Sequence, residues 1–379
     1  REDGSVAYRT DLFSRNHART GDKNPATEER NGQAADLDST KSCSVVKDPE
    51  EFCQGFEEQQ GSQPAWIGPD EFWKNVYSNL RPVPTKLEEL VVYEMHVAGL
   101  GAGHDGPGTL KDAMDMLDYL VDLGVNAVEL LPMSSFEGIA GWGYGSSHFY
   151  AIKYEPGARD QFKHFVRACH QRGIAVIVDV VYNHYSPDNE RCQWMYDTNR
   201  HDHNMYYYYK GQMSDYPEDF PEGGYCDNFS TGYLPNVADE MVRKMLIGSA
   251  VAMATEYHVD GFRMDLTQAL HSFNVLHKDG SPVPEANEAG IRFMREWART
   301  IRLCKPVALL LAEDHSGWNM IARSQSSGGV GFDDVRWSEW YHQLVGDAAP
   351  ASSKARPLPT AGYGKTRPRN MGLFAGLMA

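Results

Sequence analysis

Short apolar segments alternate with longer amphipathic segments between residues 90 and 337. The short segments, such as "IAVIVDVVYNH" (174–184), are typical of strands buried in a parallel sheet. The longer ones are typical of helices. In "TLKDAMDMLDYLVDLG" (109–124) the apolar residues share one helical face, and Gly124 marks the predicted end. Regular alternation of this kind predicts βα units around a parallel sheet.

This pattern predicts a series of strands and helices in the order of a βα barrel. The strands lie at 90–97, 126–133, 174–184, 259–266, 307–314 and, with a weaker pattern, 330–337; the helices lie at 110–124, 159–173, 238–257 and 288–302. Two further βα units of about 30 residues each do not fit into the sequence after the sixth strand. The predicted fold class is α/β, a (β/α)8 TIM barrel truncated after about six strands.

The distribution of polar and apolar residues along the chain also predicts its domain organisation. Residues 1–88 are polar and form an N-terminal extension, a possible tail of a preceding β-sandwich, with apolar patches such as "AWIGPDEFW" (65–73) that could dock on a larger body. Residues 89–379 form the partial barrel. An aromatic and acidic stretch at 185–235 is a loop insertion after the third strand.

Charge and cysteine content narrow the partners. The formal net charge of -16 argues against a nucleic acid or an anionic membrane as partner, since both favour a basic face. No apolar run approaches the roughly 18 residues that a membrane span needs, so no membrane partner is predicted. The 6 cysteines contain no CxxC pair, which argues against a zinc site and favours reduced thiols.

Three predicted strands end in carboxylates. Asp179 closes "AVIVD", Asp265 closes "GFRMD" and Glu313 closes "LLLAE". Reactive groups of parallel α/β folds lie at the carboxyl ends of strands, so these acids and Arg263 are expected to meet in one cleft. The guanidinium of Arg263 would keep a neighbouring carboxylate ionised.

Two carboxylates with different tasks are what acetal cleavage needs. Asp265, beside Arg263, suits the charged nucleophile, and Glu313, behind an apolar run, suits a protonated general acid. A single acid at a strand end is more often a helix cap or an ion-pair partner. Spacing alone also leaves open metal-dependent barrel enzymes in which such acids hold magnesium.

Three segments in order carry a family resemblance. "DVVYNH" (179–184), "GFRMDL" (261–266) and "LLAED" (310–314) resemble three of the four signature segments of the α-amylase superfamily, glycoside hydrolase family 13. "GWGYGSSHFYAI" (141–152) is similar to the loop after the second strand in its branching enzymes and trehalohydrolases. The resemblance covers about 90–337.

The resemblance implies a barrel that acts on α-glucosidic bonds with retention, through a covalent glycosyl-enzyme and without a cofactor. Asp265 would be the nucleophile, Glu313 the general acid/base and Arg263 their orienting partner. Asp179 and His184 would line the sugar-binding end, and Tyr144 would stack on the sugar at the cleaved bond. From the residues alone, Tyr144 and His184 would more often be packing residues or satisfied polar contacts.

Two details refine what the resemblance implies. Asn183 corresponds to a calcium ligand in some amylases, but branching-type members generally lack that site, so no metal is expected. The fourth signature, a His-Asp pair that supplies a third carboxylate, is absent; no acid after Glu313 follows a histidine. We therefore expect that the chain ends before the seventh strand and that it is weak or inactive alone.

The insertion holds the run "YYYY" (206–209) and further aromatic residues. Aromatic faces stack on pyranose rings, so a glucan-facing surface is one interpretation. A small hydrophobic cluster that folds the loop onto itself is an equal alternative. If the first holds, replacing Tyr207 or Tyr208 by Ala should weaken glucan binding without unfolding the barrel.

Three functions stay open. The segment "AEDHSG" (312–317) is similar to that of branching enzymes and favours a 1,4-α-glucan branching enzyme whose partner is an α-1,4-glucan of the starch or glycogen type. A hydrolase of the α-amylase or trehalohydrolase type uses the same chemistry with water as acceptor. A non-catalytic glucan-binding fragment is the third. A cytoplasmic or plastid location is consistent with unpaired cysteines and glucan storage.

Overall fold

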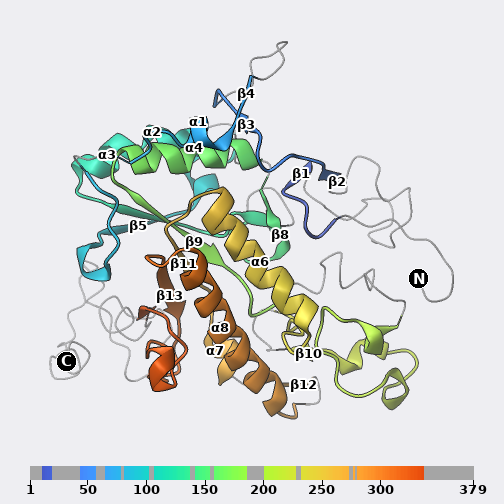
Figure 1. Ribbon diagram of the computed structural model, residues 1–379. Coiled ribbons are helices and arrows are strands. Elements are labelled where there is room, and N and C mark those ends of the chain that lie inside the picture. Colours follow the sequence, from blue (N-terminus) through green and yellow to red (C-terminus); the bar gives the residue numbers. More distant parts are fainter. Residues whose placement is uncertain are drawn as a thin grey trace, which may run out of the picture.

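A parallel sheet of 6 strands, in the order β14-β13-β11-β9-β6-β5, forms the centre of the molecule (Figure 1). The computed structural model describes residues 11–18, 43–56, 65–77, 81–101, 106–136, 141–153, 158–185, 200–227, 232–272, 276–277 and 280–336. The strands are β5 (Val92–Met95), β6 (Ala127–Leu130), β9 (Ala175–Val180), β11 (Gly261–Met264), β13 (Leu309–Glu313) and β14 (Asp334–Arg336). Each lies inside a predicted range, so the six predicted strands are confirmed.

The two faces of this sheet have different contents because side chains alternate along each strand. On one face a small cluster of Ala127, Ala175, Ile177, Leu309 and Leu311 is buried against residues of the segment 83–92. The other face carries Val176, Val178, Phe262 and Leu310, among others, and belongs to the main core. The charged residues Asp179 and Arg263 continue the first face toward the carboxyl ends.

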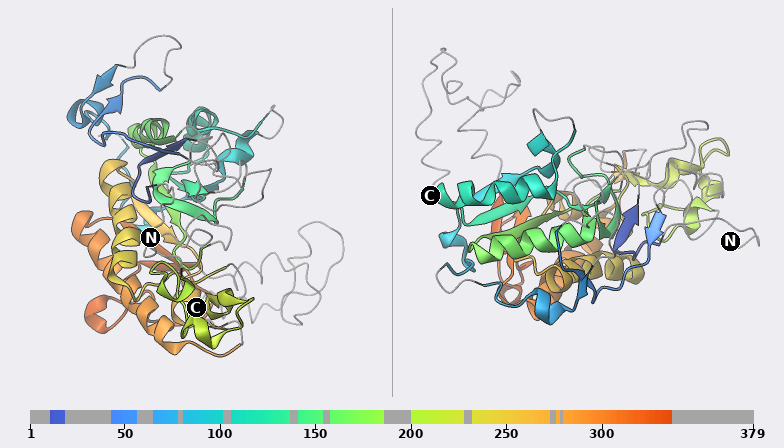
Figure 2. Two further views of the ribbon diagram at one scale, coloured as in Figure 1. Left: turned by 90° about the vertical axis from the view of Figure 1, so that its right-hand side faces the viewer. Right: turned by 90° about the horizontal axis from the view of Figure 1, so that it is seen from above.

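Helices cover the face that carries the main core, following one another around a curved arrangement (Figure 2). They are α2 (Leu110–Asp115), α3 (Leu117–Asp122), α4 (Ala158–Gln171), α6 (Glu240–Glu256) and α8 (Pro284–Cys304), with the short α7 (Gln268–His271) directly after β11. Within the described residues β5 and β14 are the outer strands. This open sheet agrees with a partial (β/α) barrel.

The helix predicted over 110–124 forms as two short helices. Thr109 caps the first through a capping box with Asp112, and Gly124, at φ 90°, follows the second. Between them, the N–H of Met116 bonds to the carbonyl of Ala113, three residues back, at 3.3 Å. The helix therefore tightens at Met116, a local change that an apolar stripe does not reveal.

A second sheet, in the order β2-β1-β8-β7, was not predicted. It joins β1 (Asn16–Ala18) and β2 (Cys43–Val45) of the N-terminal region to the hairpin of β7 (Ser134–Phe136) and β8 (Ser146–Ile152). The hairpin lies between β6 and α4 in the chain. The described parts of the N-terminal region therefore pair directly with the barrel, and the boundary at residue 88 stays a prediction.

The apolar patch at 65–73 docks on the barrel as expected. It forms β4 (Trp66–Ile67), which pairs with β3 (Phe52–Cys53), and the short helix α1 (Pro69–Phe72). Phe72 is buried, with its ring centre 4.9 Å from that of His164 on α4 and 5.1 Å from the guanidinium of Arg167. Aromatic and cation–π contacts thus fix this patch on α4.

The described part of the insertion folds onto itself. Its elements are η4 (His201–His203), η5 (Met213–Asp215), η6 (Pro221–Gly224) and β10 (Cys226–Asp227), which pairs with β12 (Leu276–His277). Tyr207 is fully buried, with ring centres 5.1 Å from Tyr185, 5.8 Å from Tyr225 and 6.0 Å from Tyr233. The expectation that Tyr207 contacts glucan is wrong, since its ring has no surface for a sugar.

The remaining short elements are η2 (Leu87–Glu89), η3 (Val97–Gly101) and η7 (Gln325–Ser327). None of the helices in the described part of the chain combines the length and the apolar character that a membrane span needs.

Candidate active site

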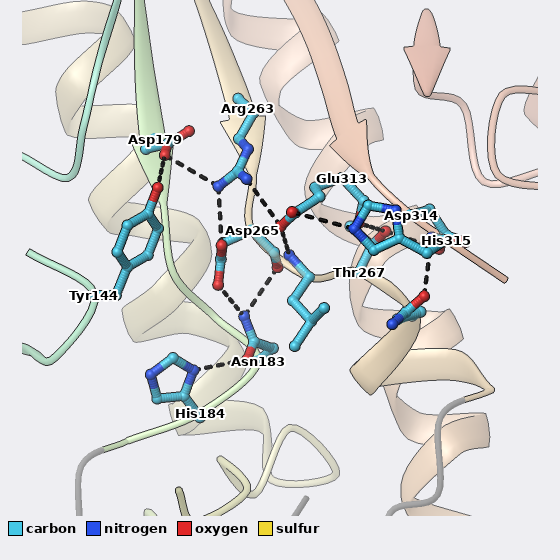
Figure 3. Close-up of polar contacts among 12 residues, drawn as sticks. Tyr144, Asp179, Asn183, His184, Arg263, Asp265, Thr267, Glu313, Asp314 and His315 are labelled. Atoms are coloured by element: carbon cyan, nitrogen blue, oxygen red, sulfur yellow. Dashed lines mark hydrogen bonds and ion pairs between the residues drawn. The ribbon is translucent and has the colours of Figure 1, made fainter. Parts of the chain in front are cut away.

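A single guanidinium joins the three predicted acids (Figure 3). Arg263 Nη1 lies 3.0 Å from Asp179 Oδ2 and 2.9 Å from Asp265 Oδ1, while Nη2 lies 2.8 Å from Glu313 Oε2. The sequence prediction that these four side chains meet is therefore confirmed. One positive charge is shared by three carboxyl groups, which makes the site rich in negative charge when all three are ionised.

The register of three neighbouring strands brings these groups together. Arg263 on β11 pairs with Asp179 on β9, and Met264 pairs with Ala312 on β13. Asp265 and Glu313 each come one residue later, at the same edge of the sheet. The apolar residues before them are buried in the strands, so the backbone that carries each acid is held rigidly.

Asp265 is buried and held on two sides. Besides Arg263, the side-chain amide of Asn183 donates to Asp265 Oδ2 at 2.8 Å and to its backbone carbonyl at 2.9 Å. Burial, opposed by the charge of Arg263 and reinforced by that of Glu313, raises the pKa of Asp265 to about 6. Asp265 is still ionised near neutral pH, as a nucleophile requires.

Glu313 is held through both of its oxygens. Oε2 accepts from the backbone N–H of Leu266 at 3.0 Å as well as from Arg263, and Oε1 lies 3.3 Å from Nε2 of His315. Burial works to raise the pKa of Glu313, but the bond to His315, the charge of Arg263 and the N–H of Leu266 lower it to about 2. The expectation of a protonated Glu313 is wrong for the ligand-free site, because donors outweigh desolvation.

Leu266, directly after Asp265, has a strained backbone. Its φ of 40° lies in the left-handed region, which side-chain-bearing residues rarely adopt. The N–H of Leu266, in the peptide plane shared with Asp265, donates to Glu313 Oε2. The turn after β11 is thus bonded to the carboxyl group at the end of β13.

Asp179 and Tyr144 form the other side of the site. The hydroxyl of Tyr144 donates to Asp179 Oδ2 at 2.7 Å, and the guanidinium of Arg263 lies 5.9 Å from the Tyr144 ring centre. Burial raises the pKa of Asp179 well above its ordinary value. Asp179 Oδ1 is buried and has no hydrogen-bond partner among the described residues, so this carboxyl group is the least satisfied of the three.

His184 lies next to the site but does not reach Arg263 in the described contacts. Its Nδ1 lies 2.7 Å from the side-chain oxygen of Asn183, which can only accept, so Nδ1 carries the hydrogen. Burial lowers the pKa of His184 to about 4, which keeps the ring neutral. The pair links His184 to Asp265 through Asn183.

Sequence reasoning missed three groups that contact the two acids. The resemblance relates Asn183 only to a calcium ligand, yet its amide orients Asp265. Leu266 and His315 bind Glu313. A signal existed for Asn183 and His315, since each is a polar residue near a strand-end acid; nothing in the letters pointed to the left-handed turn at Leu266.

Acids beyond Glu313 serve the structure where they are described. Asp333 forms an ion pair with Arg302 and accepts from the backbone N–H of Leu310 at 2.7 Å. Asp314 binds His271 at 2.6 Å. Neither provides the missing third carboxylate of the fourth signature. Among the described residues no cluster of three or more His, Cys, Asp or Glu side chains could hold a metal ion.

Comparisons with known proteins point to one family. The model of the alpha amylase catalytic domain matches residues 67–329. A malto-oligosyltrehalose trehalohydrolase from Arthrobacter ramosus is 31% identical over 67% of this chain and 38% of its own length. The 1,4-alpha-glucan branching enzyme GlgB from Rhodospirillum rubrum is 29% identical over 65% of this chain and 32% of its own length. The chain thus spans less than two-fifths of either relative.

Solved structures agree on the fold. A Salmonella typhimurium protein described as an alpha amylase matches with a TM-score of 0.50 and 23% identity, over 76% of this chain and 42% of that one. A family GH13_31 enzyme matches with a TM-score of 0.52 and 24% identity, over 67% of this chain and 52% of that one. Since the matched residues 67–329 are well over half of the chain and include the whole site, the chain belongs to the alpha-amylase family.

Proposed function

We propose that the site acts on α-glucosidic linkages with retention, through a covalent glycosyl-enzyme on Asp265. The observation that carries this proposal is the single guanidinium of Arg263 that binds both Asp265 and Glu313, at 2.9 and 2.8 Å. It puts a buried carboxylate and a second, more accessible carboxyl group beside each other, as a retaining mechanism needs. Family membership supports the same reading.

In the first step Asp265 attacks the anomeric carbon and Glu313 protonates the glycosidic oxygen, so the carbon–oxygen bond to the leaving sugar breaks as the bond to Asp265 forms. In the second step Glu313, now a carboxylate, takes the proton of an acceptor hydroxyl. The acceptor oxygen then bonds to the anomeric carbon and releases Asp265. Arg263 compensates negative charge on Asp265 in both steps.

The ligand-free charges set a requirement for the first step. Glu313 must take up a proton, although its pKa is held at about 2 in the empty site. A sugar bound between the acids would exclude water and weaken the contact with Arg263, and both changes raise the pKa of a carboxyl group. Substrate binding is thus proposed to prepare the acid.

Tyr144, Asp179 and His184 are proposed as substrate-binding residues. Tyr144 is half-buried at the edge of the site, where its ring could stack on a sugar. Asp179 Oδ1 is a buried acceptor, suited to a sugar hydroxyl if it stays ionised or to donation if protonated. His184 would line the sugar-binding end beside Asn183.

For the acceptor we favour the 6-hydroxyl of another glucan chain, as in a 1,4-α-glucan branching enzyme acting on an α-1,4-glucan. Support comes from "AEDHSG" (312–317) and from the branching enzymes among the relatives. The trehalohydrolase relative supports the alternative with water as acceptor. A cytoplasmic or plastid location stays a prediction.

An assay on amylose distinguishes these activities. Branching should change the iodine stain with few new reducing ends, whereas hydrolysis should release reducing ends in proportion to the lost stain. Asp265→Asn and Glu313→Gln serve as inactive controls. If the 379-residue chain binds amylose but leaves both readouts unchanged, the non-catalytic glucan-binding alternative replaces the proposed enzyme.

A further inference from the structure

Three successive residues at the end of β13 are each tied to the turn after β11. The backbone N–H and the hydroxyl of Thr267 both donate to the carbonyl of Glu313 at 2.8 Å. Asp314 Oδ2 lies 2.9 Å from the Thr267 hydroxyl, and the N–H of His315 donates to Gln268 Oε1 at 2.9 Å. The segment that follows the nucleophile therefore fixes the segment that carries the general acid.

Asp314 makes this connection rigid. Its Oδ2 lies 2.6 Å from Nε2 of His271, and both side chains are buried. Its Oδ1 accepts from the backbone N–H of Ser316 at 2.9 Å and from the Ser316 hydroxyl at 2.6 Å. The ring of Trp318 lies over His271, with 4.4 Å between ring centres. Both carboxylate oxygens of Asp314 are thus bonded, so the backbone turn at 314–316 is fixed. The direction of the His315 side chain is fixed with it.

His315 directs its ring toward Glu313. The Nε2 atom lies 3.3 Å from Glu313 Oε1, and both side chains are partly exposed, His315 to 26% and Glu313 to 23%. The two oxygens of Glu313 then differ. Oε2 accepts from a charged guanidinium and a backbone N–H, whereas the described contact of Oε1 is with His315.

This difference decides where a proton can sit on Glu313. Oε2 faces two donors that cannot turn into acceptors, so a proton there would meet two N–H groups. Oε1, in contrast, has one described donor, the imidazole of His315, so its second lone pair can take up a proton while Nε2 keeps donating to the first. Oε1 is therefore the oxygen that can carry the proton given to the glycosidic oxygen.

We propose that His315 is a positioning residue that holds Oε1 of Glu313 and aims its proton at the glycosidic oxygen. The inference rests on the proposed function, since it assumes that Glu313 is the general acid. In the first step the O–H bond at Oε1 breaks and the proton moves to the departing sugar oxygen. In the second, Oε1 receives the proton of the acceptor, and His315 donates to the carboxylate between the two steps.

The charged groups around Glu313 come from two parts of the chain. Arg263 and Asp265 face it from β11 and the turn that follows, and His315 faces it from its own turn. Asp314 points away, into His271. Removal of His315 therefore leaves Arg263 and the Leu266 N–H on Oε2 and frees Oε1 to rotate or bind water.

Two donors of different leaving ability test this role. Fluoride departs from α-maltotriosyl fluoride without protonation, whereas amylose requires the acid. We expect His315→Phe to lower kcat/KM on amylose by about 10- to 100-fold but on the fluoride by less than about 3-fold. His315→Gln keeps an N–H donor and should recover much of the amylose activity. His203→Gln, at an exposed histidine outside the site, is the matched control.

A second readout does not depend on activity. The ring ¹⁵N resonances of His315, assigned by their loss in His315→Gln, should shift in Glu313→Gln near neutral pH and stay unchanged in His203→Gln. An unchanged resonance, or an equal loss on both donors in His315→Phe, overturns the inference while the proposed function stands. If α-maltotriosyl fluoride places no glycosyl group on Asp265 of the Glu313→Gln chain while the resonance shift is present, the proposed function is overturned and with it the role of His315.

Discussion

Strand β11 has an aspartate at each end, and the two aspartates have opposite electrostatic surroundings. Asp260, before the strand, accepts from His170 at 2.7 Å, Lys305 at 3.0 Å and the backbone N–H of Val176 at 2.9 Å. Asp265, after it, shares the guanidinium of Arg263 with two further carboxyl groups. One end has several donors for one acid, and the other has one cation for three acids.

The pKa values follow this difference. Burial would raise the pKa of Asp260, but His170, Lys305 and Val176 lower it below the ordinary value. Burial and Glu313 raise the pKa of Asp265 to about 6 despite Arg263. The amino end of β11 therefore stabilises the fold, while the carboxyl end holds charge at a cost to stability, as functional sites do.

The largest expected effect concerns activity at the carboxyl end. Asp265→Asn removes the oxygen nucleophile that would form the glycosyl ester, so turnover of α-glucans should fall by at least about 1,000-fold. Initial rates on amylose, normalised to folded protein, measure this. Asp260→Asn should retain activity per folded molecule, and a variant at Asp265 with more than about a tenth of the activity would remove it from the mechanism.

The next effect concerns stability at the amino end. Asp260→Asn leaves the largely buried Lys305 without its counter-charge and the fully buried His170 without its carboxylate partner, so the free energy of unfolding should drop by about 3 kcal/mol near neutral pH. Denaturant titration measures it. Asp118→Asn, in the largely exposed pair with Arg172, is the control and should leave stability unchanged. Equal stability of Asp260→Asn and wild type would mean that the ion pair between Asp260 and Lys305 is not formed.

A smaller effect of opposite sign is expected for Asp265. Its pKa is raised when folded, so the ionised group costs stability above about pH 6, and this cost vanishes as pH falls below the ordinary aspartate value. Asp265→Asn should therefore stabilise the fold by about 2 kcal/mol at about pH 8 and by little at about pH 4. Unfolding curves at the two pH values measure the difference; destabilisation at the higher value would contradict the picture of excess negative charge.

The sequence predicted the positions of β9, β11 and β13 because apolar runs that end in an acid are a local signal. It also predicted the meeting of Asp179, Asp265, Glu313 and Arg263, since carboxyl ends of parallel strands share one edge. The break at Met116 and the strained turn at Leu266 depend on backbone geometry that side-chain patterns do not encode.

The protonation state of Glu313 is wrongly predicted for a different reason. Its apolar approach, "ALLLA", predicted desolvation correctly, and burial does push its pKa upward. The donors that lower the pKa of Glu313 belong to Arg263 and Leu266, about 50 residues earlier in the chain, and to His315. The pKa of a buried group depends on all of its partners, including those far away in the sequence. A single sequence does not identify these partners.

In the proposed reaction Asp265 forms a covalent bond to the sugar, while Glu313 serves the leaving group and the acceptor. The most direct measurement is the intact mass and peptide map of Glu313→Gln after incubation with α-maltotriosyl fluoride, whose fluoride leaves without an acid and whose glycosyl-enzyme then lacks a base for its release. We predict one added maltotriosyl group, located on Asp265 and absent from Asp265→Asn. An adduct on another residue, or turnover of the fluoride by Asp265→Asn as fast as by wild type, would contradict the account.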